Sequence, residues 1–362
     1  MTSNIKYVFL ITVDCLRADH VGCISGRNLT PNIDRLAKDG IVFTRAFANG
    51  PGTNQSFPAI LTSTYFLMHG GIYLSSWCKT LPEVLCGYGF KTTAFHSNPF
   101  LSRVFGWNRG FAEFYDFMGE VKAPSAMTTK TQKRALHPFK TIINWTKIGY
   151  SKRIQTFLRR AYYWFVGYHI PYLEAKELNR HIMMWIKKNK NSKFFVWIHY
   201  MDPHFPFIPP EKYLPSNFET RKDAFNFNIK VNLRNPSRGN LDLLRKLYCG
   251  EVKYVDEYIG NLISFLEDEK ILANSLILLT GDHGHAFMEH GRFGHDPEIL
   301  YNEVLHVPLI LYGLNHSGKI DLPVQLLDIS PTILHILNIK KPRSFLGKSL
   351  LLKTEYKIRE PI

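Results

Sequence analysis

The sequence predicts a large α/β fold in which a largely parallel sheet is covered by helices on both faces. Short apolar runs alternate with stretches of helical length, and the runs lack the polar alternation of a half-exposed strand. With 362 residues, 45% of them hydrophobic and 14% aromatic, the chain can bury one large core or two smaller ones. These observations exclude a chain that is disordered as a whole.

Five apolar runs are predicted to be buried strands, because each is short, rich in β-branched or aromatic residues and bounded by polar residues. In chain order they are KYVFLITVD (6–14), KTTAFHSN (91–98), KFFVWIHYMD (193–202), SLILLTGDH (275–283) and HVPLILYG (306–313). The segments between them give the β-α-β rhythm of a parallel sheet. The proline-containing segment PHFPFIPPEKY (203–213) is expected to be a surface loop.

Two of the intervening segments carry local helix signals. In LTPNIDRLAKDG, Thr30 suits the N-cap, Pro31 suits the first turn and Gly40 suits the end of the helix. The segment 171–190 ends in lysines, which complement the helix dipole. One face of this second helix holds four apolar residues, Leu178, Ile182, Trp185 and Ile186.

Cysteine use and the first strand bear on location. The five cysteines are scattered and form no C-x-x-C pair, so neither a disulfide framework nor a cysteine zinc site is indicated. The first apolar run is too short to span a membrane and ends in Asp14 and Arg17. We therefore interpret it as a strand and expect a cytoplasmic protein.

The formal charge of +15 is concentrated in one segment. Residues 119–170 contain ten Lys or Arg and a single acid, Glu120. Within them, RIQTFLRRAYYWFVGYH places apolar residues on one helical face and arginines on the other. Two interpretations stay open: a lid over the functional site, or a helix on an anionic membrane surface that makes the protein peripheral to the membrane. Nucleic-acid binding is not favoured, because no recognition motif accompanies the charge.

Polar residues gather where the predicted strands end. Asp14 ends the first, Asp202 and His204 follow the 193–202 strand, and Asp282 and His283 end the 275–283 strand. Ligands of open α/β sheets bind at the carboxyl ends of the strands, so these side chains are expected to lie together. Carboxylate oxygens and imidazole nitrogens suit Zn²⁺ or Mn²⁺. The sequence therefore predicts a metal site there.

Six motifs, in this order, resemble the sulfatase family of the alkaline phosphatase superfamily. They are FLITVDCLRADHVGC, LTPNIDRLAKDGIVFTRAFANGPGTNQSFPAILTS, HYMDPHFPFIPP, LTGDHGHAFMEHGRFGHD, LYNEVLHVPLILYG and VQLLDISPTIL. The resemblance implies a three-layer sandwich with a largely parallel central sheet flanked by helices. It also implies a sulfatase-like domain over 1–351 that contains the 119–170 insertion, and a short tail over 352–362.

The resemblance also implies metal ligands and a nucleophile. By position, Asp14, Asp282 and His283 bind the cation, and the bend before FPAILTS supplies the nucleophile. Members of the family typically carry a Cys or Ser there, in a C/S-x-P-x-R pattern, which is converted to formylglycine. Counting back from AILTS places Thr53 at this position, where it would also contact the metal.

The chain departs from the family pattern at the nucleophile position, where Thr53 stands, and at Cys15. Ser56 begins an imitation of the nucleophile motif, but Ile60 stands where the motif has Arg. Cys15 stands where many calcium-dependent members carry a second Asp. Because Thr cannot become formylglycine, these departures favour phosphate over sulfate esters.

The resemblance places His204 and His295 at substrate-contacting positions, where His204 would also act in catalysis. The predicted cofactor is one divalent cation (Mn²⁺, Zn²⁺ or Ca²⁺). Asp202 stays open between orienting His204 and contributing to a second metal. His285 and His290 are expected to line the mouth of the site or to face solvent.

We therefore expect a metal-dependent hydrolase of phosphate or sulfate esters with Thr53 as nucleophile, phosphate esters being favoured. Its substrate would be a small-molecule, glycan or lipid ester. The alternatives are a transferase that passes a phosphoryl-linked group to a glycan or lipid acceptor, a genuine sulfuric ester hydrolase, and a non-enzymatic family member.

Overall fold

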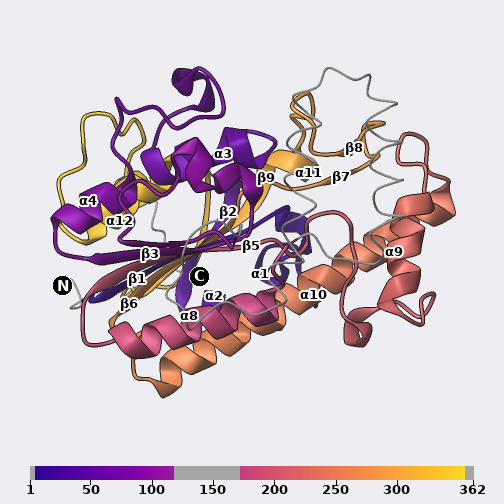
Figure 1. Cartoon of the computed structure of the whole chain (residues 1–362), viewed down its shortest axis with the longest axis horizontal. Coiled ribbons are helices and arrows are strands. Elements are labelled where there is room, and N and C mark those ends of the chain that lie inside the picture. Colours follow the sequence, from indigo (N-terminus) through magenta and orange to yellow (C-terminus); the bar gives the residue numbers. More distant parts are fainter. Residues whose placement is uncertain (1–4, 118–171, 355–362) are drawn as a thin grey trace.

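The computed structural model describes residues 5–117 and 172–354, and its strands form a central sheet between two layers of helices (Figure 1). From edge to edge, the strands of this sheet are β10 (Gly318–Gln325), β2 (Gly40–Phe47), β9 (His306–Tyr312), β6 (Ser275–Gly281), β1 (Tyr7–Val13), β5 (Phe194–Tyr200), β3 (Lys91–Phe95) and β4 (Glu113–Tyr115). Strand β9 runs antiparallel to β2 and β6, and the other neighbours are parallel. The predicted fold class is therefore confirmed. The basic insertion expected over 119–170 lies outside the described residues.

Helices cover both faces of the sheet. The longer ones are α2 (Pro31–Lys38), α3 (Thr53–Thr62), α4 (Leu81–Gly87), α8 (Ala175–Asn189), α9 (Arg221–Lys230), α10 (Arg238–Asp268) and α12 (Ile329–Ile336). Helices α3, α4 and α12 lie on one face, and α2, α8 and α10 lie on the other (Figure 1).

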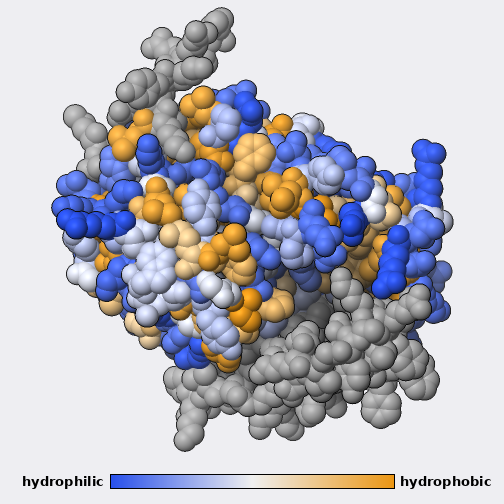
Figure 2. Space-filling view, turned by 90° about the horizontal axis from the view of Figure 1, so that it is seen from above, coloured by the Kyte–Doolittle hydropathy of each residue, from blue (hydrophilic) through white to orange (hydrophobic). Residues whose placement is uncertain are grey.

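Short elements connect these layers. They are the helical turns α1 (Gly22–Ser25), α11 (Asn302–Leu305) and α13 (Leu350–Thr354), the 3-10 helices η1 (Ala18–His20), η2 (Phe66–His69), η3 (Pro99–Leu101), η4 (Arg103–Phe105), η5 (Glu211–Tyr213), η6 (Leu272–Asn274) and η7 (Leu326–Asp328), and a small hairpin of β7 (Ala286–Phe287) and β8 (Phe293–Gly294). Within the two described ranges, no helix combines the length and the apolar character that crossing a bilayer requires. On the face above α3, hydrophobic residues form small scattered groups among hydrophilic ones (Figure 2).

Strand β1 shows why the sheet residues read as unbroken apolar runs. All its residues are buried, and they alternate between two cores. Phe9 and Ile11 belong to the core under α8 and α10, whereas Val8 and Leu10 belong to the core under α3 and α12. Because both faces of this strand are covered, all of its side chains are buried and its sequence does not alternate between polar and apolar residues.

All five predicted strands are present, as β1, β3, β5, β6 and β9. Strands β2, β4 and β10 were not predicted. Strand β10, at one edge of the sheet, is mostly exposed or half-buried and lacks a long apolar run. Strand β2 lies inside the sheet and begins with four buried residues, so the sequence pattern also missed a largely buried strand.

The predicted helices are present, with one boundary error. Helix α2 begins at Pro31 and ends at Lys38, but Gly40 begins β2 instead of ending the helix. Thr30 stands at the N-cap without capping the helix backbone, because its hydroxyl oxygen accepts from the main-chain N–H of Gly22 at 2.8 Å and its proton goes to the Asp34 carboxylate at 3.2 Å. On α8, the four apolar residues predicted to share a face are all buried.

The proline-containing segment after β5 is not the surface loop that the sequence suggested. Phe207 and Ile208 are 0% and 1% exposed. The main-chain N–H of Phe207 donates to the Asn228 side chain at 3.1 Å, and that of Ile208 donates to Glu251 at 2.6 Å. The middle of this segment is therefore buried and fixed by hydrogen bonds. These contacts hold the backbone that leads to His204 in place.

We expect Ile182→Ala to lower the free energy of unfolding by about 2–5 kcal/mol, because Ile182 is fully buried and leaves a cavity. Met184, on the same helix, is 36% exposed, and Met184→Ala should change stability by less than about 0.5 kcal/mol. Urea unfolding followed by circular dichroism measures both. Equal losses from the two variants would contradict the assignment of the buried face of α8.

Candidate functional site

Side chains from separate segments meet at the carboxyl edge of the sheet. Asp14 follows β1, Asp282 and His283 follow β6, and Thr53 is the first residue of α3. Strands β1 and β6 are parallel neighbours, so their ends place these residues side by side. One carboxylate oxygen each from Asp14 and Asp282 and one ring nitrogen of His283 lie within 4.8 Å of one another.

His283 stands in the middle of this group. Its Nε2 lies 3.6 Å from Asp14 Oδ1, 3.5 Å from Asp282 Oδ2 and 3.4 Å from Thr53 Oγ1. Its Nδ1 lies 2.9 Å from the carbonyl oxygen of Gly284, to which it can only donate. The proton therefore belongs on Nδ1, and Nε2 presents a lone pair to the centre of the group.

Two glycines allow the chain to turn tightly at this point. A Cβ atom on Gly281 would lie 2.5 Å from the carbonyl oxygen of Leu16, and one on Gly284 would lie 2.2 Å from that of Glu303. Such distances are too short for a side chain. Glycine at both positions lets neighbouring backbone approach Asp282 and His283 closely.

In each of the two carboxylates, one oxygen accepts hydrogen bonds from the protein and the other accepts none from the described residues. Asp282 Oδ1 accepts from the main-chain N–H of His283 at 2.8 Å and from that of Cys15 at 3.3 Å. Asp14 Oδ2 accepts from the Asn98 amide at 3.0 Å. Among the described residues, Asp14 Oδ1 and Asp282 Oδ2 are buried without a hydrogen-bond partner.

These leftover oxygens fit a cation. Burying unpaired carboxylate oxygens side by side costs free energy, and a divalent cation between them offsets that cost. The donors available are two carboxylates, one imidazole and the Thr53 hydroxyl, a set that suits a divalent metal. The structure thus brings together Asp14, Thr53, Asp282 and His283, the four residues predicted as metal ligands.

The pKa values of the two carboxyl groups differ. Burial raises the pKa of Asp282 well above its usual range, and the negative charge of Asp14 raises it further. Burial acts in the same direction on Asp14, but the charges of His204, His199 and His283 lower its pKa overall. The buried pair therefore favours a single negative charge until a cation compensates the second.

The hydroxyl that faces the group belongs to Thr53 and not to Ser56. Thr53 Oγ1 lies 3.4 Å from His283 Nε2. The Ser56 hydroxyl, one turn further along α3, donates to the main-chain carbonyl of Asp282 at 2.6 Å and is fully buried. Ser56 thus holds α3 against the turn after β6.

Asn98 and His199 belong to the site although neither was predicted. The Asn98 amide donates to Asp14 and lies 3.5 Å from Thr53 Oγ1. His199 Nε2 lies 3.3 Å from Asp14 Oδ2. Asn98 follows β3, so the rule that polar residues gather at strand ends could have found it. His199 lies inside the apolar run of β5 and carries no such signal.

Buried hydrogen bonds around the Thr12 hydroxyl fix the ring of His199. The Thr12 hydroxyl donates to the carbonyl of Ile198 at 3.1 Å, which uses its only proton. It therefore accepts from Trp197 Nε1 at 3.1 Å and from His199 Nδ1 at 3.0 Å. The ring of His199 is thereby oriented with Nε2 toward Asp14.

The other histidines divide into two groups by position. The ring centres of His204 and His295 are 5.4 Å apart, and His295 lies 4.5 Å from His283, so both rings flank the metal-ligand group. His285 is buried against Phe207, its ring centre 5.2 Å from that ring. His290 pairs with Glu303 at 2.7 Å and is half exposed. The structure places His204 and His295, but not His290, beside the group.

Asp202 lies under the segment that carries His204. Its Oδ2 accepts from the main-chain N–H of Ala175 at 3.1 Å, where α8 begins. Burial, reinforced by the charge of Glu174, raises the pKa of Asp202 to about 8, and burial beside Asp202 raises that of Glu251 as well. No group of described residues that could hold a metal includes Asp202, so the second-metal alternative for this residue gains no support.

Known proteins resemble this chain along most of its length. The family model described as Sulfatase matches residues 6–339. Iduronate 2-sulfatase of Mus musculus is 25% identical over 343 residues, which cover 84% of this chain and only 59% of that protein's length. The structure of a phosphonate monoester hydrolase from Silicibacter pomeroyi superposes with a TM-score of 0.70 at 20% identity, over 99% of this chain and 78% of that one. The lipoteichoic acid synthase LtaP from Listeria monocytogenes gives 0.62 at 19% identity, over 96% and 75%.

We predict that Asp202→Asn changes how stability depends on pH. The folded pKa of Asp202, about 8, lies above its ordinary value of 3.8. The folded protein therefore keeps a proton that the unfolded chain releases, and stability falls as pH rises between about 4 and 8. Because Asn cannot ionise, the variant should gain stability relative to the natural chain as pH rises. Thermal unfolding at a series of pH values, with the exposed Asp242→Asn as control, measures this, and parallel curves for the natural chain and Asp202→Asn would refute it.

Proposed function

Because this chain belongs to the sulfatase family, we propose that it is a metal-dependent enzyme that cleaves phosphate or sulfate esters, with phosphate esters preferred and Thr53 as nucleophile. The observation that carries the proposal is the convergence of the Thr53 hydroxyl with two incompletely paired buried carboxylates and His283. Asp14, Asp282 and His283, with Thr53 itself, would hold the cation. When bound, a divalent cation would increase the acidity of the Thr53 hydroxyl and offset the charge of the group being transferred.

Thr53 would attack phosphorus in line with the leaving group. As the first residue of α3, it stands at a helix N-terminus, where unpaired main-chain N–H groups favour negative charge. Its hydroxyl would release its proton to solvent, and Oγ would form a bond to phosphorus while the bond from phosphorus to the leaving-group oxygen breaks. Water would then release the phosphate and restore the hydroxyl.

Asn98 would position this nucleophile. Its amide reaches both Asp14 Oδ2 and Thr53 Oγ1, at 3.0 and 3.5 Å. An amide N–H donates and takes up no proton, so it can hold Oγ without competing for the hydroxyl proton. Asn98 thereby couples the nucleophile to a metal-ligand carboxylate.

His204 and His295 would act on the substrate side of the group. The ring of His295 lies against His283, and His204 lies beside His295 and Asp14. His204 would protonate the departing oxygen, and both rings would offer N–H donors to the oxygens of the transferred group.

The position of Ser56 favours phosphorus over sulfur. Conversion to formylglycine requires a Cys or Ser at the nucleophile position, and this chain has Thr53 there. Ser56 has its hydroxyl committed to the carbonyl of Asp282. Transfer to a glycan or lipid alcohol would share the first step and differ only in the acceptor, so added alcohols that divert product from free phosphate would identify a transferase.

We predict that Thr53→Ala abolishes ester cleavage and leaves metal binding measurable, since Asp14, Asp282 and His283 remain. Thr53→Ser should keep activity because it keeps the hydroxyl. Ser56→Ala should remain active and lose stability by about 1 kcal/mol, the worth of its hydrogen bond. The assay uses aryl phosphates, phosphodiesters, phosphonates and sulfates with Mn²⁺, Zn²⁺, Ca²⁺ and Mg²⁺. An inactive Ser56→Ala, an active Thr53→Ala and formylglycine at residue 56 by mass spectrometry would instead identify a sulfatase.

Asn98→Ala should lower kcat and metal affinity by about 10- to 100-fold, because removing a side chain that supports a metal ligand has effects of this size. Steady-state kinetics and metal titration measure the two quantities. Asn232→Ala, at an exposed position after α9, is the matched control and should change neither. Unchanged metal affinity in Asn98→Ala would show that the contact with Asp14 is dispensable.

A further inference from the structure

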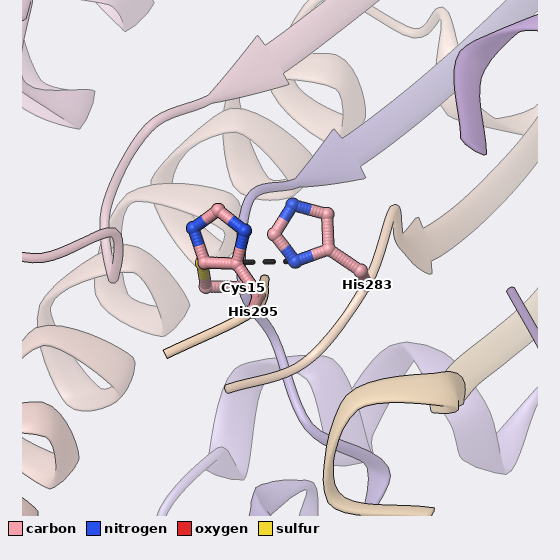
Figure 3. A group of neighbouring side chains, drawn as sticks. All are labelled: Cys15, His283 and His295. Atoms are coloured by element: carbon pink, nitrogen blue, oxygen red, sulfur yellow. Dashed lines mark hydrogen bonds between the residues drawn. The ribbon is translucent and has the colours of Figure 1, made fainter. Parts of the chain in front are cut away.

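Cys15 lies directly after Asp14 and against the same group of side chains. Its Sγ is 3.8 Å from Nδ1 of His283, and its side chain is fully buried. Figure 3 shows Cys15 and the rings of His283 and His295 gathered at one point. The ligand atoms of these three residues lie within 4.8 Å of one another, and so do those of Asp14, Cys15 and His204. The sulfur is therefore near Asp14 and near the Nδ1 edge of His283, two residues that would hold the cation, the second through its Nε2.

Two hydrogen bonds, one to Asp282 and one from Tyr248, fix the backbone of Cys15. Its N–H donates to Asp282 Oδ1 at 3.3 Å, and its carbonyl accepts from the Tyr248 hydroxyl at 2.8 Å. Its φ of 59° lies in the left-handed region, which costs free energy for a residue with a side chain. The surrounding contacts thus maintain an unfavourable conformation that keeps the thiol next to the centre.

We propose that Cys15 is a sulfur ligand of the cation, and that it makes the centre selective for a soft divalent ion such as Zn²⁺ over Ca²⁺. This proposal rests on the metal centre of the proposed function. Thiolate and imidazole donors suit Zn²⁺ and Co²⁺, whereas Ca²⁺ takes oxygen ligands. On binding, the thiol would give its proton to solvent, and the thiolate would supply the sulfur donor that Zn²⁺ favours.

A purely structural role would make Cys15 a small apolar side chain that fills space behind Asp14. Such a role accounts for its burial equally well and predicts no bond between sulfur and metal. Cobalt separates the two roles, because Co²⁺ bound by a thiolate absorbs in the near ultraviolet through charge transfer from sulfur, whereas Co²⁺ bound by oxygen and nitrogen alone does not.

The test is titration of the full chain, stripped of metal by a chelator, with Co²⁺. We expect a charge-transfer band that saturates with a single ion per chain and is lost in Cys15→Ser. Cys78→Ser removes another buried thiol, in the loop before α4, and should leave the band unchanged. Cys15→Asp, which exchanges sulfur for oxygen, should lower the ratio of Zn²⁺ to Ca²⁺ affinity by at least about tenfold.

Cobalt binding by the natural chain without this band would overturn the inference, as would a band that persists in Cys15→Ser. The spectrum of the natural chain decides the matter even where a variant does not fold. Ester cleavage by the cobalt-loaded natural chain without the band would refute the sulfur ligand alone. The band without ester cleavage would support the ligand and refute the proposed function.

Discussion

Asp14 and Asp282 lie side by side at the ends of two central strands and are buried from solvent. Many of the surrounding residues hold these two carboxylates in position. Each carboxylate has one oxygen held by N–H donors and one left over at the centre of the group. The held oxygens fix the orientation of both side chains, so the other two oxygens point toward the same place. Such an arrangement would pre-organise the cation position of the proposed function at the cost of burying negative charge.

The support behind Asp14 extends well beyond the residues that would touch a metal. Trp197, Thr12 and His199 form a buried hydrogen-bonded relay on β1 and β5, and its last member faces Asp14. Thr12 and Trp197 lie within the sheet, where a shift of one strand would misplace the relay. Register between β1 and β5 is therefore a property of the site as well as of the fold.

The sequence predicted most of the strands that are covered on both faces and most of the polar residues that follow them. Runs such as SLILLTG are apolar throughout because both faces are covered, and the acids at their ends follow from the rule for open sheets. Edge strands and the segment around Phe207 were misjudged, since their burial is set by tertiary packing and not by composition. His199 was missed for a related reason: inside a buried strand, a histidine with a partner far along the chain looks like any other core residue. The raised pKa of Asp202 arises from its burial and, next, from the charge of Glu174, and both conditions exist only in the folded chain.

The pairing of β1 has a consequence for how the protein is made. Tyr7, at its start, lies opposite Phe194 on one side and Ser275 on the other. During synthesis, β1 has no partner strand until more than half of the chain, including β5, has been made. Until then its apolar residues and its two edges are exposed to aggregation. Pairings this distant in sequence also slow folding. Because Asp14 and Asp282 meet only after the β1–β6 pairing has formed, a cation that bound between them would stabilise the folded chain and not its precursors.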